Sequence, residues 1–380
     1  MSQEGALDND ATMGFDENHD PGGSSGDDFS TIIPGLPNWA AQQCLARVPR
    51  GMYQRLRSVS TAWRDNLRPD VIYPIRSAEG ISEAWLYMTL MGHEVFHALD
   101  PALMVWHELP SIPWDQCYAM GDKECFVAGR QLLMVGPSLQ GMRVLPMIRR
   151  YSLDENEWSI APPMNVSRCL FASATSDSAA FVAGGARFAS RDPLNSAEMF
   201  FSQTNRWQML PDMHTARKEC SGFVMDGCFY VIGGSNEKDE AYTSAECYNP
   251  RTRRWTLVPY MWPESVRLQG GTLAPAPPLV AVVGNKLYAW DHPNGLLKKY
   301  NKSSNRWAVV GGAPGRLPNP QSHGWGLGFK AVGNELWLIG GSDPEIPFID
   351  AWRPDTQSWR RVAQTWNGQA FVFNCAVMKA

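Results

Sequence analysis

Several features that usually indicate the class of a protein are scarce in this chain of 380 residues. Charged residues make up only 19% of the sequence, and Lys and Arg form no basic stripe of the kind that binds nucleic acid. No apolar run is long enough for a membrane-spanning helix. The first residues contain neither a basic region nor an apolar core, so we expect no secretory signal. The composition therefore predicts neither nucleic acid nor membrane as a partner.

The eight cysteines contain no C-x-x-C pair, which excludes a zinc ribbon and a dithiol redox motif. Several of them, such as Cys169, Cys220 and Cys375, lie in or beside apolar runs, where cysteine behaves as a small buried hydrophobe. We predict that the cysteines are reduced and structural, and that the protein needs no metal and no cofactor.

One short motif does suggest metal chemistry, because HEVFH at residues 93–97 matches the H-E-x-x-H pattern of zinc peptidases. The extended form of that motif needs a glycine and a third histidine at positions that are occupied here by Asp100 and Leu103. Asp100 and Pro101 also form a turn pair that would end a helix directly after the motif. We therefore interpret the stretch as the approach to a β-strand.

Tryptophan, glycine and proline are abundant instead, with 16 Trp, 33 Gly and 28 Pro, which is typical of a turn-rich and strand-rich protein. Six tryptophans recur at intervals of 48 to 52 residues, and a large apolar residue lies seven positions before each of them. Such a period predicts six copies of one β-hairpin. The six anchors are Trp106, Trp158, Trp207, Trp255, Trp307 and Trp359.

Upstream of most hairpins, an apolar run ends in glycine, and a tight turn and another apolar strand precede that run. Each repeat is therefore predicted to contain four antiparallel strands, which we call a, b, c and d. The glycine pairs match no phosphate-binding loop, so we interpret them as points where one sheet closely approaches its neighbour. They are Gly184, Gly185, Gly233, Gly234, Gly340 and Gly341.

Four-stranded sheets that cannot bury both faces alone pack as blades around an axis. The array begins with a strand b at residue 84, and a lone strand a follows residue 370. These two pieces can complete one blade, which would close the ring without an open edge. We therefore predict a mainly β protein, in which residues 84–380 form a six-bladed β-propeller closed by its C-terminal strand.

The preceding residues differ from this pattern. Residues 1–30 carry eight Asp or Glu and no Lys or Arg, and we expect them to be a disordered acidic tail. Residues 31–70 show helical periodicity, and residues 71–83 are expected to be a linker. A helical segment this short rarely folds alone, so its apolar face is expected to contact a partner or the ring. A helical cap packed on the propeller is the alternative.

The motifs resemble those of known families. Leu36-Pro37, the Leu-x-Arg-Val-Pro run at 45–49 and the Arg-x-Val-x-x-x-Trp-Arg run at 57–64 resemble the F-box. The glycine pairs, the Tyr or Phe and the Trp resemble kelch repeats in type and spacing. After residue 31 the chain thus resembles plant-type F-box/kelch-repeat proteins, although the run at 42–44 is more polar than usual and the first and fifth repeats lack the glycine pair.

This resemblance implies a non-catalytic substrate receptor of a Skp–cullin–F-box ubiquitin ligase that acts in the nucleus or cytoplasm. The F-box would bind the Skp adaptor, and through it the cullin, and the propeller would hold an unidentified target protein near the ligase. The residues implied in adaptor binding are Leu36, Pro37, Cys44, Leu45, Val48 and Pro49.

The strand order assigns the target to one face of the ring. The a–b and c–d connections are tight turns, whereas the b–c and d–a connections on the other face are long and irregular, as recognition loops usually are. Kelch receptors grip acidic motifs with arginines, and the resemblance extends this role to Arg168, Arg187 and Arg217. Ordinary surface positions are the alternative for each candidate. Further candidates are Asn236, Trp262, Arg267 and His323.

Two other classes of kelch protein compete with this interpretation. A kelch copper oxidase needs His and Tyr ligands that converge on the axis, whereas the seven histidines here are scattered along the chain. A kelch scaffold, for example one that binds cytoskeletal filaments, would have no use for helices that resemble an F-box. Residues 1–30 are also too few for the flavin-binding light sensor of some relatives.

Overall fold

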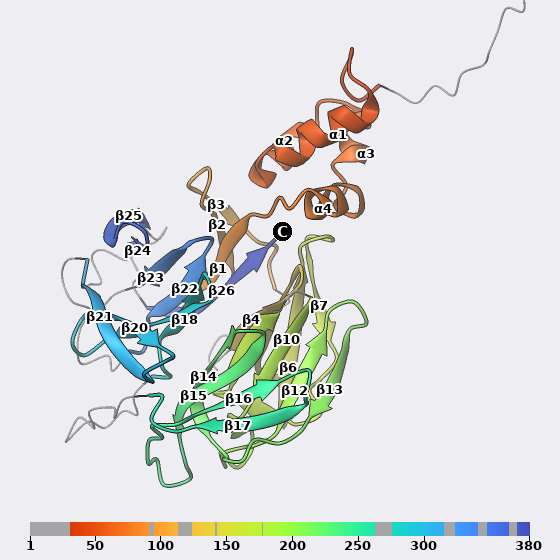
Figure 1. The fold of residues 1–380 in the computed structure, drawn as a ribbon. Helices are drawn as coiled ribbons and strands as arrows, with labels where there is room; N and C mark the ends of the chain where they lie inside the picture. Colours follow the sequence, from red (N-terminus) through yellow and green to blue (C-terminus); the bar gives the residue numbers. More distant parts are fainter. Residues whose placement is uncertain are drawn as a thin grey trace, which may run out of the picture.

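The computed structural model describes residues 31–90, 95–112, 124–140, 143–176, 178–262, 276–314, 324–340, 348–364 and 371–380. These residues form a short helical unit followed by six four-stranded antiparallel sheets (Figure 1). The sheets are the blades of a ring, which confirms the predicted six-bladed β-propeller with an N-terminal helical part.

The blades use the strands in chain order from the axis outward, except that the first blade takes its innermost strand from the C-terminus. Blade 1 consists of β26 (Val372–Lys379), β1 (Ala84–Leu90), β2 (His97–Asp100) and β3 (Val105–Glu108). Blade 2 consists of β4 (Glu124–Ala128), β5 (Gln131–Gln140), β6 (Arg143–Ser152) and β7 (Glu157–Ala161). Blade 3 consists of β9 (Ala172–Ser176), β10 (Ala179–Ala183), β12 (Ala197–Phe201) and β13 (Arg206–Leu210). Beside it lies a ribbon of β8 (Arg168–Cys169) and β11 (Ala186–Arg187).

The other three blades follow the same order. Blade 4 consists of β14 (Lys218–Met225), β15 (Cys228–Ser235), β16 (Ala245–Asn249) and β17 (Arg254–Val258). Blade 5 consists of β18 (Val280–Val283), β19 (Lys286–Asp291), β20 (Leu296–Asn301) and β21 (Arg306–Gly312). Blade 6 consists of β22 (Gly328–Val332), β23 (Glu335–Ile339), β24 (Phe348–Arg353) and β25 (Ser358–Gln364).

The C-terminal strand closes the ring. β26 pairs with β1 along its whole length, from Lys379 opposite Ala84 to Val372 opposite Leu90. The innermost strands contact one another in a complete circle, in which β26 lies between β22 and β4. Closure leaves no innermost strand at an open edge, and the predicted pairing of the two chain segments is confirmed.

The tryptophan hairpin occurs in every blade. Each tryptophan lies directly opposite the residue seven positions before it; for example, the rings of Trp255 and Tyr248 have centroids 5.3 Å apart. The second residue before each tryptophan has a left-handed φ of 50 to 56°, so the six c–d turns share one shape. The pairs are Leu99–Trp106, Tyr151–Trp158, Phe200–Trp207, Tyr248–Trp255, Tyr300–Trp307 and Trp352–Trp359.

In five of these tryptophans the indole also donates a hydrogen bond to a described residue of the preceding blade. The indole N–H of Trp158 donates to the carbonyl of Pro110 at 2.9 Å, just beyond the outermost strand of blade 1. This bond satisfies a partly buried donor and fixes two neighbouring sheets relative to each other. The equivalent bonds are Trp207 to Pro162, Trp255 to Pro211, Trp307 to Met261 and Trp359 to Gly312.

Two of the glycine pairs lie at contacts between blades, as predicted. A Cβ atom on Gly184 would lie 2.6 Å from the carbonyl oxygen of Arg217 in the next blade, and one on Gly233 would lie 2.7 Å from Pro278. No side chain fits at such a distance, and both glycines also have positive φ. Gly185, Gly234 and Gly340 have positive φ as well, and Gly341 lies outside the described residues.

The helical unit extends further than we expected. Residues 71–78 of the expected linker belong to a helix that Pro69 opens at its first turn, where the missing N–H costs no hydrogen bond. Ile72 and Tyr73 of this helix lie in the core of the unit. None of the described helices is long and apolar enough to cross a membrane. The helices are α1 (Asn38–Arg47), the 3₁₀ turn η1 (Arg50–Met52), α2 (Tyr53–Leu56), α3 (Thr61–Asn66) and α4 (Pro69–Ala78).

One arginine of α4 joins the helices to the ring. Arg76 is 1% exposed and donates to the carbonyls of Ala46 and Val48, at 2.9 and 3.2 Å, where α1 ends. Its other terminal nitrogen pairs with Glu83 at 2.7 Å. The backbone of Glu83 pairs in turn with that of Ala380, next to the closing strand. Arg76 and Glu83 therefore connect α1, α4 and blade 1.

The helical unit rests on the face of the ring that carries the tight turns (Figure 1). The guanidinium of Arg130, in the a–b turn of blade 2, lies 5.0 Å from the ring of Tyr73. The guanidinium of Arg50 lies 4.0 Å over the ring of Trp85 at the start of β1. Gly51 packs so closely on the c–d turn of blade 1 that a Cβ would overlap Asp100. The b–c and d–a connections therefore lie on the face opposite the helices.

Removal of residues 372–380 should open the ring, because β1, β4 and β22 would each lose a neighbouring strand. We expect the truncated chain to aggregate or unfold, as seen by gel filtration and thermal melting. A chain without residues 1–30 is the control and should melt like the full chain. Unchanged melting after the C-terminal truncation would contradict ring closure.

Glu83→Ala should lower the free energy of unfolding by about 2–3 kcal/mol, because it leaves the buried charge of Arg76 without its partner. Glu79→Ala is the matched control, since it removes the exposed pair with Arg47 and should cost less than about 0.5 kcal/mol. Urea unfolding of the two variants measures both changes. Equal effects would argue against a joining role for Glu83.

Candidate functional site

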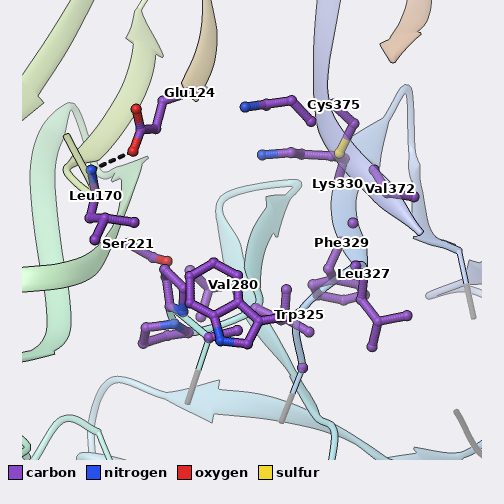
Figure 2. Close-up of a pocket in the computed structure, with 18 of the residues that line it drawn as sticks. Glu124, Leu170, Ser221, Val280, Trp325, Leu327, Phe329, Lys330, Val372 and Cys375 are labelled. Atoms are coloured by element: carbon purple, nitrogen blue, oxygen red, sulfur yellow. Dashed lines mark hydrogen bonds between the residues drawn. The ribbon is translucent and has the colours of Figure 1, made fainter. Parts of the chain in front are cut away.

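The innermost strands surround a cavity of about 470 Å³ on the axis of the ring. It includes residues that precede strands β9, β18, β22 and β26, so it extends to the end of the axis where the d–a connections enter. Figure 2 shows side chains that reach it from all six blades. From blade 1 to blade 6 these include Cys375, Glu124, Leu170, Ser221, Val280 and Lys330.

The wall from blade 6 alternates glycine with large apolar residues in the stretch GWGLGFK at 324–330. A Cβ atom on Gly326 would lie 2.5 Å from the ring of Phe371, and one on Gly328 would lie 2.6 Å from the sulfur of Cys375. The glycines thus let blades 6 and 1 approach closely beside the cavity. We did not identify this wall from the sequence, although the alternation of glycine with Trp, Leu and Phe was visible there.

The cavity is lined by polar as well as apolar residues, and the polar ones include Glu124, Ser173, Ser221, Lys330 and Asn374. Lys330 extends into it from β22, and no described carboxylate forms an ion pair with the ammonium of Lys330 (Figure 2). Glu124 lies on the opposite wall and accepts a hydrogen bond from the backbone N–H of Leu170. Burial raises the pKa of the Cys375 thiol, so this neighbour of Lys330 is uncharged at neutral pH. Among the described residues that line the cavity, Lys330 is therefore a cation without a paired carboxylate.

Arg168 does not point toward the mouth of the channel, so that prediction is wrong. Its side chain is fully buried in blade 3 and pairs with Glu198 at 2.9 Å. The guanidinium also donates to the carbonyls of Gly184 and Ser196 at 2.9 and 2.8 Å. Burial lowers the pKa of Arg168, while Glu198 acts in the opposite direction. A target could not reach this side chain without opening the blade.

Arg217 repeats the same arrangement in blade 4, and its predicted role at the channel mouth is also wrong. It is fully buried, pairs with Glu246 at 3.2 Å and donates to the carbonyls of Gly233 and Ser244. The sequence did contain a signal for this role, because Ser-Ala-Glu recurs at 196–198 and 244–246. A repeated acidic residue inside a strand indicates a structural partner for a repeated arginine.

The other predicted target-binding residues differ in exposure. Arg187 is exposed at the end of β11. The side-chain oxygen of Asn236 accepts hydrogen bonds from the backbone N–H groups of Lys238 and Glu240, so Asn236 shapes its own loop. Trp262 is half-buried and packs edge-to-face on Trp307. Arg267 and His323 lie outside the described residues.

The predicted adaptor-binding residues also differ in exposure. Leu36, Pro37 and Cys44 are exposed on the helical unit. Leu45 is only 1% exposed and belongs to the core of the unit, so it cannot contact a partner directly. Its position on α1 faces the other helices, which the spacing of apolar residues alone did not distinguish from an outward face. Val48 and Pro49 are half-buried.

Two exposed apolar residues of the helical unit were missed by the sequence analysis. Trp39 is 70% exposed and Val59 is 60% exposed, more than Leu36 at 40%. Trp39 lies in the first turn of α1, two residues after Pro37, and Val59 lies in the turn between α2 and α3. An aromatic residue this exposed on a small helical unit indicates a surface for a partner.

The motif that suggested zinc leads into a strand. His97 is the first residue of β2, as predicted, whereas His93 and Glu94 lie outside the described residues. In the part of the chain that the structure describes, no group of three or more His, Cys, Asp or Glu side chains could hold a metal ion.

Comparison with known proteins identifies both parts of the chain. A model of the Kelch motif matches residues 167–214 and 216–261, which cover blades 3 and 4. The F-box/kelch-repeat protein At1g26930 of Arabidopsis thaliana is 38% identical over 379 residues, with 97% of this chain and 87% of that protein covered. The F-box/kelch-repeat protein SKIP11 of Arabidopsis thaliana is 36% identical over 369 residues, with 95% and 77% covered.

Arg168→Met should lower the free energy of unfolding by about 3–4 kcal/mol, because Glu198 would remain buried without its cation. Arg187→Met is a close control, since Arg187 lies opposite Arg168 in the ribbon of β8 and β11 but is exposed. It should change stability by less than about 0.5 kcal/mol. Urea denaturation measures the free energy of unfolding of both variants. An equally small loss of stability in both would contradict the buried role of Arg168 and restore it as a surface residue.

Proposed function

This chain belongs to the F-box/kelch-repeat proteins, and we propose that it is the substrate-recognition subunit of a Skp–cullin–F-box ubiquitin ligase. In this proposal the helical unit binds the Skp adaptor, and through it the cullin. The propeller binds the protein that is to be ubiquitinated. Both tasks are binding, so the subunit itself is not an enzyme, and it raises the effective concentration of the target near the ligase.

The observation that carries the adaptor-binding role is the exposure of Trp39 and Val59. The unit buries its own core and rests on the ring through Tyr73 and Arg50, yet these two large apolar side chains remain in contact with solvent. Exposed aromatic residues are typical anchors of protein interfaces. With Leu36, they give the helical unit an apolar surface that the propeller does not cover.

The placement of the helical unit supports a division of roles between the two faces. The helices contact the a–b and c–d turns of blades 1 and 2, so the b–c and d–a connections point away from them. In our proposal the target binds on that opposite loop face, where Arg187 is an exposed cation. The ion pair between Arg76 and Glu83 then holds the adaptor and the target in a fixed relative orientation.

We further propose that the protein works in the nucleus or cytoplasm. The described cysteines, of which four are buried, are all free thiols, and this supports a reducing compartment.

Trp39→Asp and Val59→Asp should each weaken binding of a purified Skp adaptor at least tenfold, because each places a charge in an apolar contact. Both residues are exposed, so the melting temperature of the free chain should not change. Calorimetric titration of the full chain measures the affinity, and Ser77→Asp on α4 serves as the control.

The outcomes of this titration separate two questions. A wild-type chain that does not bind the adaptor would overturn the ligase proposal. Wild-type affinity in both aspartate variants would leave the ligase role in place but move the adaptor-binding surface elsewhere on the helical unit.

A further inference from the structure

The axial cavity has the size and lining of a binding site for a small organic molecule. Its volume of about 470 Å³ lies within the range of about 300–1,000 Å³ that is common for ligand pockets. Trp325, Leu327, Phe329 and Val280 form an apolar part of its wall, and polar side chains such as Glu124, Ser221 and Lys330 form other parts (Figure 2). Such a wall favours a flat, apolar body in the occupant.

The charge of Lys330 indicates the polar end of that occupant. Lys330 is half-buried and has no ion-pair partner among the described carboxylates. The Cys375 thiol beside it is uncharged, and Glu124 is on the opposite wall, bonded to the backbone of Leu170. An anionic group of a ligand would supply the missing partner.

Glu124 also limits the charge of the occupant. A second negative charge at the far end of a ligand would approach this carboxylate, and like charges in a partly buried site repel each other. The two walls therefore favour one anionic end near Lys330 and an uncharged end near Glu124.

We propose that the axial cavity binds a small monocarboxylate with a flat apolar body, whose carboxylate pairs with Lys330 and whose body packs on Trp325 and Phe329. A free small molecule fits this lining better than a peptide, because a peptide backbone brings amide groups that need hydrogen-bond partners. The cavity opens on the loop face, so the bound molecule would form part of the surface that meets the target. Only this last consequence rests on the proposed ligase function.

Three naphthalene probes test the proposal on the purified full chain. Naphthoate carries one carboxylate, naphthamide is its neutral counterpart, and naphthalenedicarboxylate carries a second carboxylate at the far end. Quenching of tryptophan fluorescence reports binding beside Trp325. We expect naphthoate to bind about tenfold more tightly than either of the other probes, as one charge-assisted contact implies.

Lys330→Met should abolish the preference for naphthoate over naphthamide, whereas Lys286→Met, at an exposed site on the turn face, should preserve it. Equal affinities of the two probes for the wild-type chain, or a preference that survives Lys330→Met, would overturn the proposal. If Lys330→Met does not fold, the comparison of the three probes on the wild-type chain decides alone.

A fourth probe distinguishes the source of the carboxylate. A short peptide that ends in Phe with a free carboxylate is compared with its C-terminal amide. Lys330-dependent binding of this peptide, without binding of naphthoate, would assign the cavity to a protein ligand and overturn the small-molecule proposal. None of these titrations contains the adaptor, so their failure is independent of the adaptor titration that tests the ligase function.

Discussion

The ring depends on one repeated interaction, in which a tryptophan of the outermost strand packs across its own hairpin and hydrogen-bonds to the preceding blade. Trp158 shows both parts, since its ring packs at a tilt against Tyr151 and its indole N–H donates to the carbonyl of Pro110. The same side chain therefore fixes the c–d turn inside a blade and the contact between blades. Because each bond joins sheets that are adjacent in the chain, the propeller is assembled from neighbour-to-neighbour contacts. Between the last and first blades the chain order differs, and β26 joins them by pairing with β1 and lying beside β22.

Two blades carry an additional internal brace. In blades 3 and 4 a buried arginine joins the glycine pair at the end of strand b to the acidic residue of strand c, as Arg217 does with Glu246. At the position of this acidic residue on strand c, blade 2 has Arg149 and blade 5 has Lys298. Neither cation can form an ion pair with an arginine. The Kelch motif matches just the two braced blades. In blade 6 the equivalent residue is Asp350, which is buried and pairs with Arg361 of strand d. All six blades keep the tryptophan hairpin, so the hairpin is the part of the repeat that they share.

Local periodicity in the sequence was enough to predict the fold. The site, in contrast, depends on contacts between residues that are far apart in the chain. The intervals between tryptophans and the unmatched strands at the two ends of the array were sufficient for six blades and for closure. The burial of the Arg168 side chain was not predictable from local periodicity, because its partner Glu198 lies 30 residues further along the chain, on β12. The α4 helix continues through residues 71–78, which we expected to be a linker, although Pro74 lies inside it. The axial cavity combines segments from all six blades, and no short stretch of sequence contains it.

Closure of the ring and placement of the helical unit depend on the same end of the chain. The pairing of β26 with β1 continues into the backbone bonds between Ala380 and Glu83, and Glu83 binds Arg76 of α4. The strand that completes blade 1 thus also anchors the residue that holds the helices. Further along, β26 contributes Cys375 to the wall of the cavity. A single strand therefore connects the helical unit on the turn face with the cavity that opens on the loop face. Because a paired central strand is rigid, the distance between the two proposed binding surfaces is set by the blade and not by a linker.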